Sequence, residues 1–199
     1  MIRYLFIILI TYSLLTSSCS TRIISNNYYQ EKKETVDSIE SRYEKLNARN
    51  PFAIAFTDKK LNIISIEMIS DTLTRIYEFN INEKRLADSL IKYNYDTTGI
   101  YYLIRKMQET KVTWINSVDY YVNDRPQQLI YLSIKPVTIR YLFSPPKYIA
   151  LGYFRIPQSF DEKGRLLDSR RTKKVRKIKG QVFYKITDRI CYTVTDKYR

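Results

Sequence analysis

The side chains that usually carry out acid–base or nucleophilic catalysis are sparse in this chain. It has no histidine, and its only cysteines among 199 residues are Cys19 and Cys191. The lack of histidine excludes the usual catalytic triads and nearly all zinc sites, because imidazole is the common general base and metal ligand. The sequence also has no phosphate-binding loop, calcium loop or Ser-x-x-Lys nucleophile motif. We therefore expect no metal, no cofactor and no catalysis.

Carboxylates are the one remaining route to catalysis, because a glycosidase needs only two acids. The acids in strand-like and turn-like parts of the chain are scattered, and no spacing marks a pair: Glu67, Asp71, Glu78, Asp119, Asp124, Asp161 and Asp188. A carboxylate-based hydrolase stays open as an alternative. A sheltered pair of acids in a cleft would favour it.

Positive charge is the most concentrated chemical feature. The formal net charge is +14 and the pI is about 9.6, which favours acidic partners. One run near the C-terminus is especially basic: Lys163, Arg165, Arg170, Arg171, Lys173, Lys174, Arg176, Lys177 and Lys179. This run is a candidate contact for anionic lipid, an envelope polymer or an acidic protein, because each basic residue near an anionic surface adds about 1 kcal/mol. It could equally be a solvated edge hairpin whose charges prevent aggregation.

The N-terminus has the pattern of a secretory signal that ends at a cysteine. Arg3 precedes a short apolar run over residues 4–10, which suits a signal peptide better than a spanning helix. The stretch Thr16-Ser17-Ser18-Cys19 resembles the lipobox of bacterial lipoproteins, in which the cysteine is diacylated and the chain is cut just before it. It departs from the family pattern at Thr16, where leucine is preferred.

This resemblance implies a signal peptide over 1–18, a lipidated tether over 19–27 and a single domain over 28–199. Ser20 stands where lipoproteins kept in the inner membrane often have aspartate. The resemblance therefore implies an outer-membrane anchor and a domain on the periplasmic face, where nucleic acid is not an expected partner. With Cys19 lipidated, Cys191 has no partner for an intramolecular disulfide and is predicted to be a small buried residue.

The rest of the sequence predicts an α+β fold: an antiparallel sheet of several strands with an N-terminal amphipathic helix and two central helices. Val36, Ile39, Tyr43 and Leu46 share one face of a helix predicted over 27–50. The two central helices are predicted to begin at Asn82 and at Thr98. Strands are predicted at 52–57, 61–69, 73–79, 112–122, 128–135, 137–143, 148–156 and 182–194, with a bulged turn at 160–166.

Together these features favour a non-catalytic binding or accessory module of the bacterial envelope. An immunity protein against a toxin delivered to the periplasm is one alternative, although a basic one would need an acidic toxin. A carboxylate-based envelope hydrolase is the other.

Overall fold

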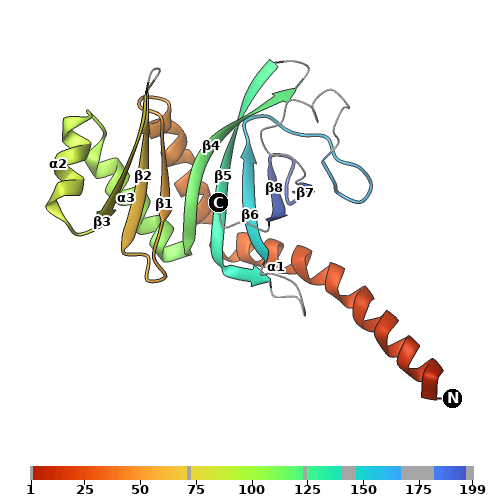
Figure 1. The fold of residues 1–199 in the computed structure, drawn as a ribbon. Coiled ribbons are helices and arrows are strands. Elements are labelled where there is room, and N and C mark those ends of the chain that lie inside the picture. Colours follow the sequence, from red (N-terminus) through yellow and green to blue (C-terminus); the bar gives the residue numbers. More distant parts are fainter. Residues whose placement is uncertain (1, 71–72, 123–124, 140–146, 167–181, 196–199) are drawn as a thin grey trace.

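The described residues of the computed structural model form three helices and one antiparallel sheet (Figure 1). The description covers residues 2–70, 73–122, 125–139, 147–166 and 182–195. The helices are α1 (Ile2–Asn47), α2 (Lys84–Lys92) and α3 (Thr97–Thr110). The strands are β1 (Phe52–Phe56), β2 (Ile63–Ile69), β3 (Thr74–Asn80), β4 (Val112–Val122), β5 (Arg125–Ile139), β6 (Lys147–Phe154), β7 (Tyr184–Lys185) and β8 (Ile190–Thr195).

The eight strands lie in the order β3-β2-β1-β4-β5-β6-β8-β7. Every pairing between neighbours is antiparallel. The predicted α+β architecture, with its N-terminal helix and two central helices, is therefore confirmed. β3 and β7 are the two edge strands.

Helix α1 buries the face that its periodicity predicted. Val36, Ile39 and Tyr43 are fully buried, and the helix ends shortly before Pro51. It begins much earlier than predicted, at Ile2, because no glycine or proline interrupts residues 2–47. Residues 20–27, predicted as a polar tether, are part of this helix, and Ser25 is fully buried there.

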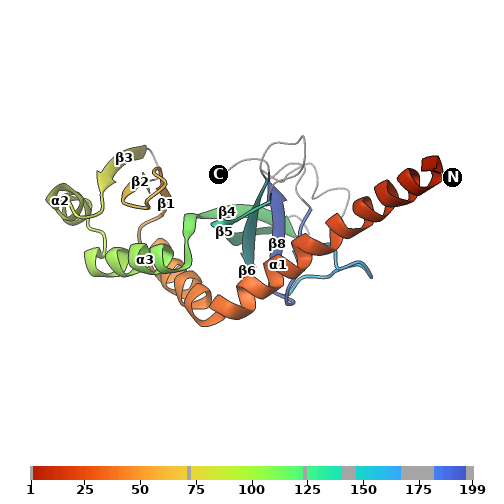
Figure 2. The ribbon, with the colours of Figure 1, turned by 90° about the horizontal axis from the view of Figure 1, so that it is seen from below.

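Helices α1 and α3 pack against each other on one side of the sheet, as Figure 2 shows. Their contacts run in antiparallel order: Tyr28 with Thr110, Ser38 with Tyr102, and Arg42 with Asp96. Asp96 also caps α3 by accepting a hydrogen bond from the Gly99 N–H. A Cβ on Gly99 would come within 2.8 Å of Leu46, so glycine permits this close approach.

The two faces of the sheet are covered differently along its width. Ile149 to Phe154 of β6 are all buried, so both faces of this strand are covered. A second apolar cluster, which includes Phe160, Leu166 and Phe183, covers the face of β5 and β6 that points away from the helices. In β2, by contrast, buried and half-buried residues alternate, as expected where only one face meets a core.

Two strand predictions were wrong in their boundaries. The strand predicted at 128–135 and residues 137–139 of the strand predicted at 137–143 belong to one strand, β5, which continues through Pro136; residues 140–143 lie outside the described residues. The strand predicted at 182–194 is divided into β7 and β8 by a turn, in which the Thr187 hydroxyl accepts hydrogen bonds from the N–H groups of Arg189 and Ile190. The bulged turn at 160–166 is confirmed, with Gly164 at φ 74°.

Candidate functional site

The structure describes only part of the predicted sites. The backbone of Cys19 lies within α1. In the predicted basic run, Lys163 and Arg165 lie in the exposed turn before β7. The remaining members fall outside the described residues: Arg170, Arg171, Lys173, Lys174, Arg176, Lys177 and Lys179.

The charge of Arg165 is used within its own turn. Its Nε lies 2.7 Å from Asp161 Oδ2, and Asp161 also accepts the backbone N–H groups of Lys163 and Arg165. These backbone hydrogen bonds and the guanidinium lower the pKa of Asp161. Arg165 therefore organises the turn in addition to adding positive charge.

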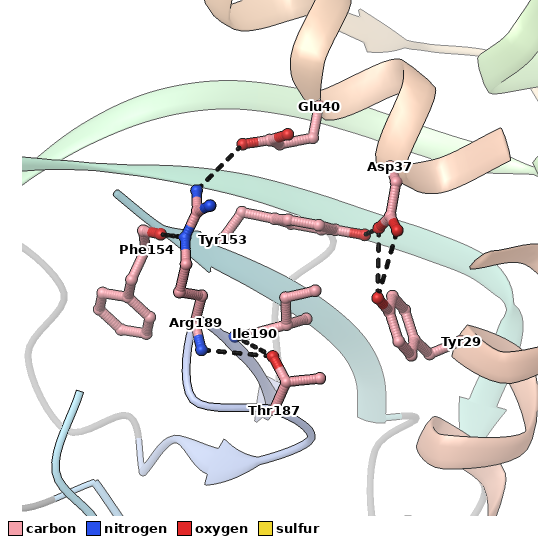
Figure 3. Close-up of polar contacts among 8 residues, drawn as sticks. All are labelled: Tyr29, Asp37, Glu40, Tyr153, Phe154, Thr187, Arg189 and Ile190. Carbon is pink, nitrogen blue, oxygen red and sulfur yellow. Dashed lines mark hydrogen bonds and ion pairs between the residues drawn. The ribbon is translucent and has the colours of Figure 1, made fainter. Parts of the chain in front are cut away.

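A cluster of polar side chains lies between α1 and the sheet (Figure 3). Asp37 of α1 accepts hydrogen bonds from the hydroxyls of Tyr29 at 3.3 Å and Tyr153 at 3.2 Å. Burial and the negative charge of Asp37 raise the pKa of Tyr29 to about 12 and that of Tyr153 further. Both tyrosines therefore stay protonated and act as donors. The Tyr29 hydrogen bond lies within α1, whereas that of Tyr153 ties α1 to β6.

Glu40 lies one turn further along α1 and has an arginine partner. Its Oε1 is 4.0 Å from an Nη of Arg189, whose Nε donates to the Phe154 carbonyl at 3.0 Å. The Glu40 side chain is only 15% exposed. Burial raises its pKa, and the negative charge of Glu44 raises it further, while Arg189 acts in the opposite direction.

Glu40 and Glu44 line a cavity of about 80 Å³ together with Tyr43, Ser117, Gln128 and Arg155. That volume holds a few water molecules, whereas small-molecule pockets are usually about 300–1,000 Å³. Both acids lie on α1, and among the described lining residues the sheet side contributes Arg155 but no acid. A glycosidase needs carboxyl groups on both sides of the bond it cleaves. This cleft does not have that arrangement.

Sequence reasoning missed this cluster. The predicted acids of the strands and turns do not line the cavity, whereas Glu40 and Glu44 of α1, which were not among the predicted acids, do. Asp37, Glu40 and Glu44 follow the spacing of one helix face next to the buried stripe. That spacing was the available signal, but the strand that covers it is distant in the sequence.

A larger cavity of about 440 Å³ lies where α1 ends, lined in part by Arg49, Asn94 and Asp96. Its size suits a small molecule. Several of its polar groups are already engaged: the Asn94 carbonyl accepts from Asn50 Nδ2 at 2.8 Å, and Asp96 caps α3. The cavity therefore shows no convergent set of unpaired polar groups that would indicate a ligand.

No known protein family, curated protein or solved structure matches the chain. In the part of the chain that the structure describes, no helix combines the length and hydropathy needed to span a bilayer. Among the described residues, no three aspartate, glutamate or cysteine side chains lie close enough together to hold a metal ion.

Proposed function

We propose that the protein is an envelope lipoprotein, anchored through Cys19 in the outer membrane, whose domain acts on the periplasmic face as a non-catalytic binding or accessory module. The observation that carries this proposal is the signal-like N-terminus ending in Thr16-Ser17-Ser18-Cys19. Two or three acyl chains on one cysteine would hold the domain at the membrane durably.

The course of α1 supports an anchor close to the domain. Ser25 is already fully buried, six residues beyond Cys19. At a rise of about 1.5 Å per residue, the body of the domain begins within about 9 Å of the anchor along the helix. The domain would therefore lie next to the bilayer instead of hanging from a long flexible tether.

Exposed apolar side chains at the other end of the molecule support binding there, although others, such as Ile23 and Ile156, lie elsewhere. The N-terminal end of α1 and the α2–β3 region lie at opposite ends (Figures 1 and 2). Exposed apolar side chains occur in that remote region, at Leu73, Ile76 and Ile91. A partner could therefore reach this end while the lipid holds the opposite one.

One observation favours the hydrolase alternative: Glu40 is a sheltered acid with a raised pKa, which is a property of general acids. A second acid facing it across the cleft would be needed to complete the pair. The immunity-protein alternative is a specific form of the binding proposal, in which the partner is an acidic toxin.

Labelling of growing cells with a palmitate analogue tests the anchor. We expect the intact protein to take up label and to sediment with outer membranes. Cys19→Ala should lose the label and leave the outer-membrane fraction, while Cys191→Ala, the matched control, keeps both. An unlabelled intact protein, or equal labelling of Cys19→Ala, would contradict the proposal.

A further inference from the structure

Within the described part of the chain, β2 is the only strand that pairs with β3, so some backbone groups of β3 face an open edge. The two strands pair in an unbroken register from Ile63↔Asn80 to Ile69↔Thr74. The Ile81 N–H donates to the Asn62 carbonyl at this pairing, and the Leu73 carbonyl accepts from the Ser70 N–H. Backbone groups of alternate residues point to the same side of a strand. The odd-numbered residues therefore face β2, and the N–H and C=O groups of Thr74, Ile76 and Glu78 point to the open edge.

This edge lacks several of the usual protections against pairing with another chain. Edge strands are commonly blunted by short length, proline, charged side chains (especially lysine) or a bulge. β3 has seven residues, no proline or lysine and no shift in register, and its charged residues are Arg75 and Glu78. Ile76, at the middle of the strand, is 67% exposed. The opposite edge strand, β7, has only two residues, one of which is Lys185.

Two cations border the edge on the side of the sheet that faces the helices. Arg75 and Lys92 lie over the ring of Tyr93 at 5.1 Å and 5.5 Å from its centroid. Within the described residues neither forms an ion pair. The hydroxyls of Tyr93 and Tyr77 form a hydrogen bond of 2.6 Å, which fixes the Tyr93 ring and its two cations beside β3. The two cations favour an acidic partner on this face.

We propose that the open edge of β3 binds an extended segment of a partner protein, which joins the sheet as an additional strand. The segment has acidic residues on the face beside Arg75 and Lys92 and apolar residues on the face beside Ile76. This inference rests on the proposed function, because it supplies the binding surface of the module. Main-chain hydrogen bonds give affinity in this mode, and the alternating side chains give specificity.

A second copy of the chain fits the edge less well. Antiparallel pairing of two β3 strands would relate the copies by a two-fold axis normal to the sheet. Both copies would carry a formal net charge of +14, so like charges would repel across this pairing, whereas an acidic segment would be attracted.

The register defines a peptide probe, the labelled heptapeptide Glu-Val-Glu-Val-Glu-Val-Glu. When the peptide pairs antiparallel to β3 with its valines on the face of Ile76, the valine N–H groups point to β3 and the glutamate N–H groups point away. We expect the lipidated protein in detergent to bind this peptide. N-methylation of the valines should weaken binding by about tenfold or more, whereas N-methylation of the inner glutamates changes it little.

Two protein variants extend the test. Ile76→Pro removes an N–H that β2 does not use, so it should leave the sheet folded and weaken peptide binding by about tenfold. Ile76→Thr keeps the N–H and should stay within about threefold of the parent. If Ile76→Pro fails to fold, as judged by its circular dichroism, the two methylated peptides still decide the question on the unaltered protein.

Three results would overturn the inference: no binding of the heptapeptide, equal weakening by both methylation patterns, or a dimer of the parent that Ile76→Pro converts to a monomer. The last would assign the edge to a second copy. Palmitate labelling of Cys19 is independent of all three. A labelled protein that ignores the peptide refutes the β3 inference alone, whereas a peptide-binding protein without label refutes the lipid anchor alone.

Discussion

The half of the sheet formed by β4, β5, β6 and β8 and the half formed by β1, β2 and β3 belong to one continuous layer but differ in what covers them. In the first half, helices pack on one face and Phe160, Leu166 and Phe183 on the other. In the second half, the residues become more exposed from strand to strand: those of β1 are all buried, whereas most of those of β3 are exposed. The first half can therefore supply most of the stability, which leaves the β3 edge free to contact a partner at little cost to the fold.

The largest expected effect is in the doubly covered half. Leu132 is fully buried and lies opposite Ile115 and Leu151 on the neighbouring strands. Leu132→Ala should lower the free energy of unfolding by about 2–5 kcal/mol, because it leaves a cavity in a packed core. Urea denaturation measures this. A loss below about 1 kcal/mol would show that this half is not the stable part of the sheet.

The cover on the second face can be tested separately. A Cβ on Gly152 would lie 3.1 Å from Leu129 Cδ1 and 3.3 Å from Phe183 Cε1. We expect Gly152→Ala to destabilise by about 1–3 kcal/mol through overpacking. Gly152→Ala in a Phe183→Leu background is the control, since the smaller side chain should relieve part of the loss. An unchanged loss in that background would place the overpacking at Leu129 and not at Phe183.

The cleft at Glu40 predicts a pH dependence. Its pKa in the folded protein lies above the ordinary value of 4.5, so the folded state binds more protons between the two values. The stabilising contribution of Glu40 is therefore complete below pH 4.5 and is lost as the pH rises through the folded pKa. Glu40→Gln should reduce this loss, as seen in Tm measured from about pH 4 to about pH 7.

The difference between the two Tm curves gives the contribution of Glu40 alone. The surrounding charged groups are present in both proteins: the acids Asp37 and Glu44 and the cations Arg155 and Arg189. Parallel curves for Glu40→Gln and the parent would contradict the raised pKa.

The smallest effect on stability is expected at the open edge. Ile76→Ala should change the free energy of unfolding by no more than about 0.5 kcal/mol, because its side chain is mostly exposed. Urea denaturation beside Leu132→Ala gives the comparison directly. A loss approaching that of Leu132→Ala would show that the edge is part of the core, and so not free for a partner.

Local patterns in the sequence were enough to predict much of this fold. The stripe at Val36, Ile39 and Tyr43 identified the buried face of α1, and β-branched and aromatic runs located β1 and β4 within a residue. Predictions failed where contacts between distant residues, or local hydrogen bonds, determine where a strand begins or ends. The turn made by Thr187 interrupts a run that otherwise resembles one strand.

The candidate sites were harder to predict for the same reason. Glu40 has the polar character of a solvated helix position, and only the packing of β6 and Arg189 against α1 makes it a sheltered acid. Likewise, nothing in the local sequence of β3 distinguishes an edge strand from a central one. Its position became clear only from the strand order. The motif at Cys19 is local in the sequence, so it could be recognised without the fold.

The most direct test of the account compares the two sheet edges in living cells. A photoreactive benzophenone side chain would be placed at position 76 on β3 or at position 185 on β7, in the lipidated protein. We predict that the protein with the benzophenone at position 76 forms a covalent adduct with one partner protein. Thr74→Pro, which removes another N–H group from the open edge, should abolish this adduct. The benzophenone at position 185 should form no adduct. Adducts from position 185 without any from position 76 would contradict the claim that the anchored domain binds through β3.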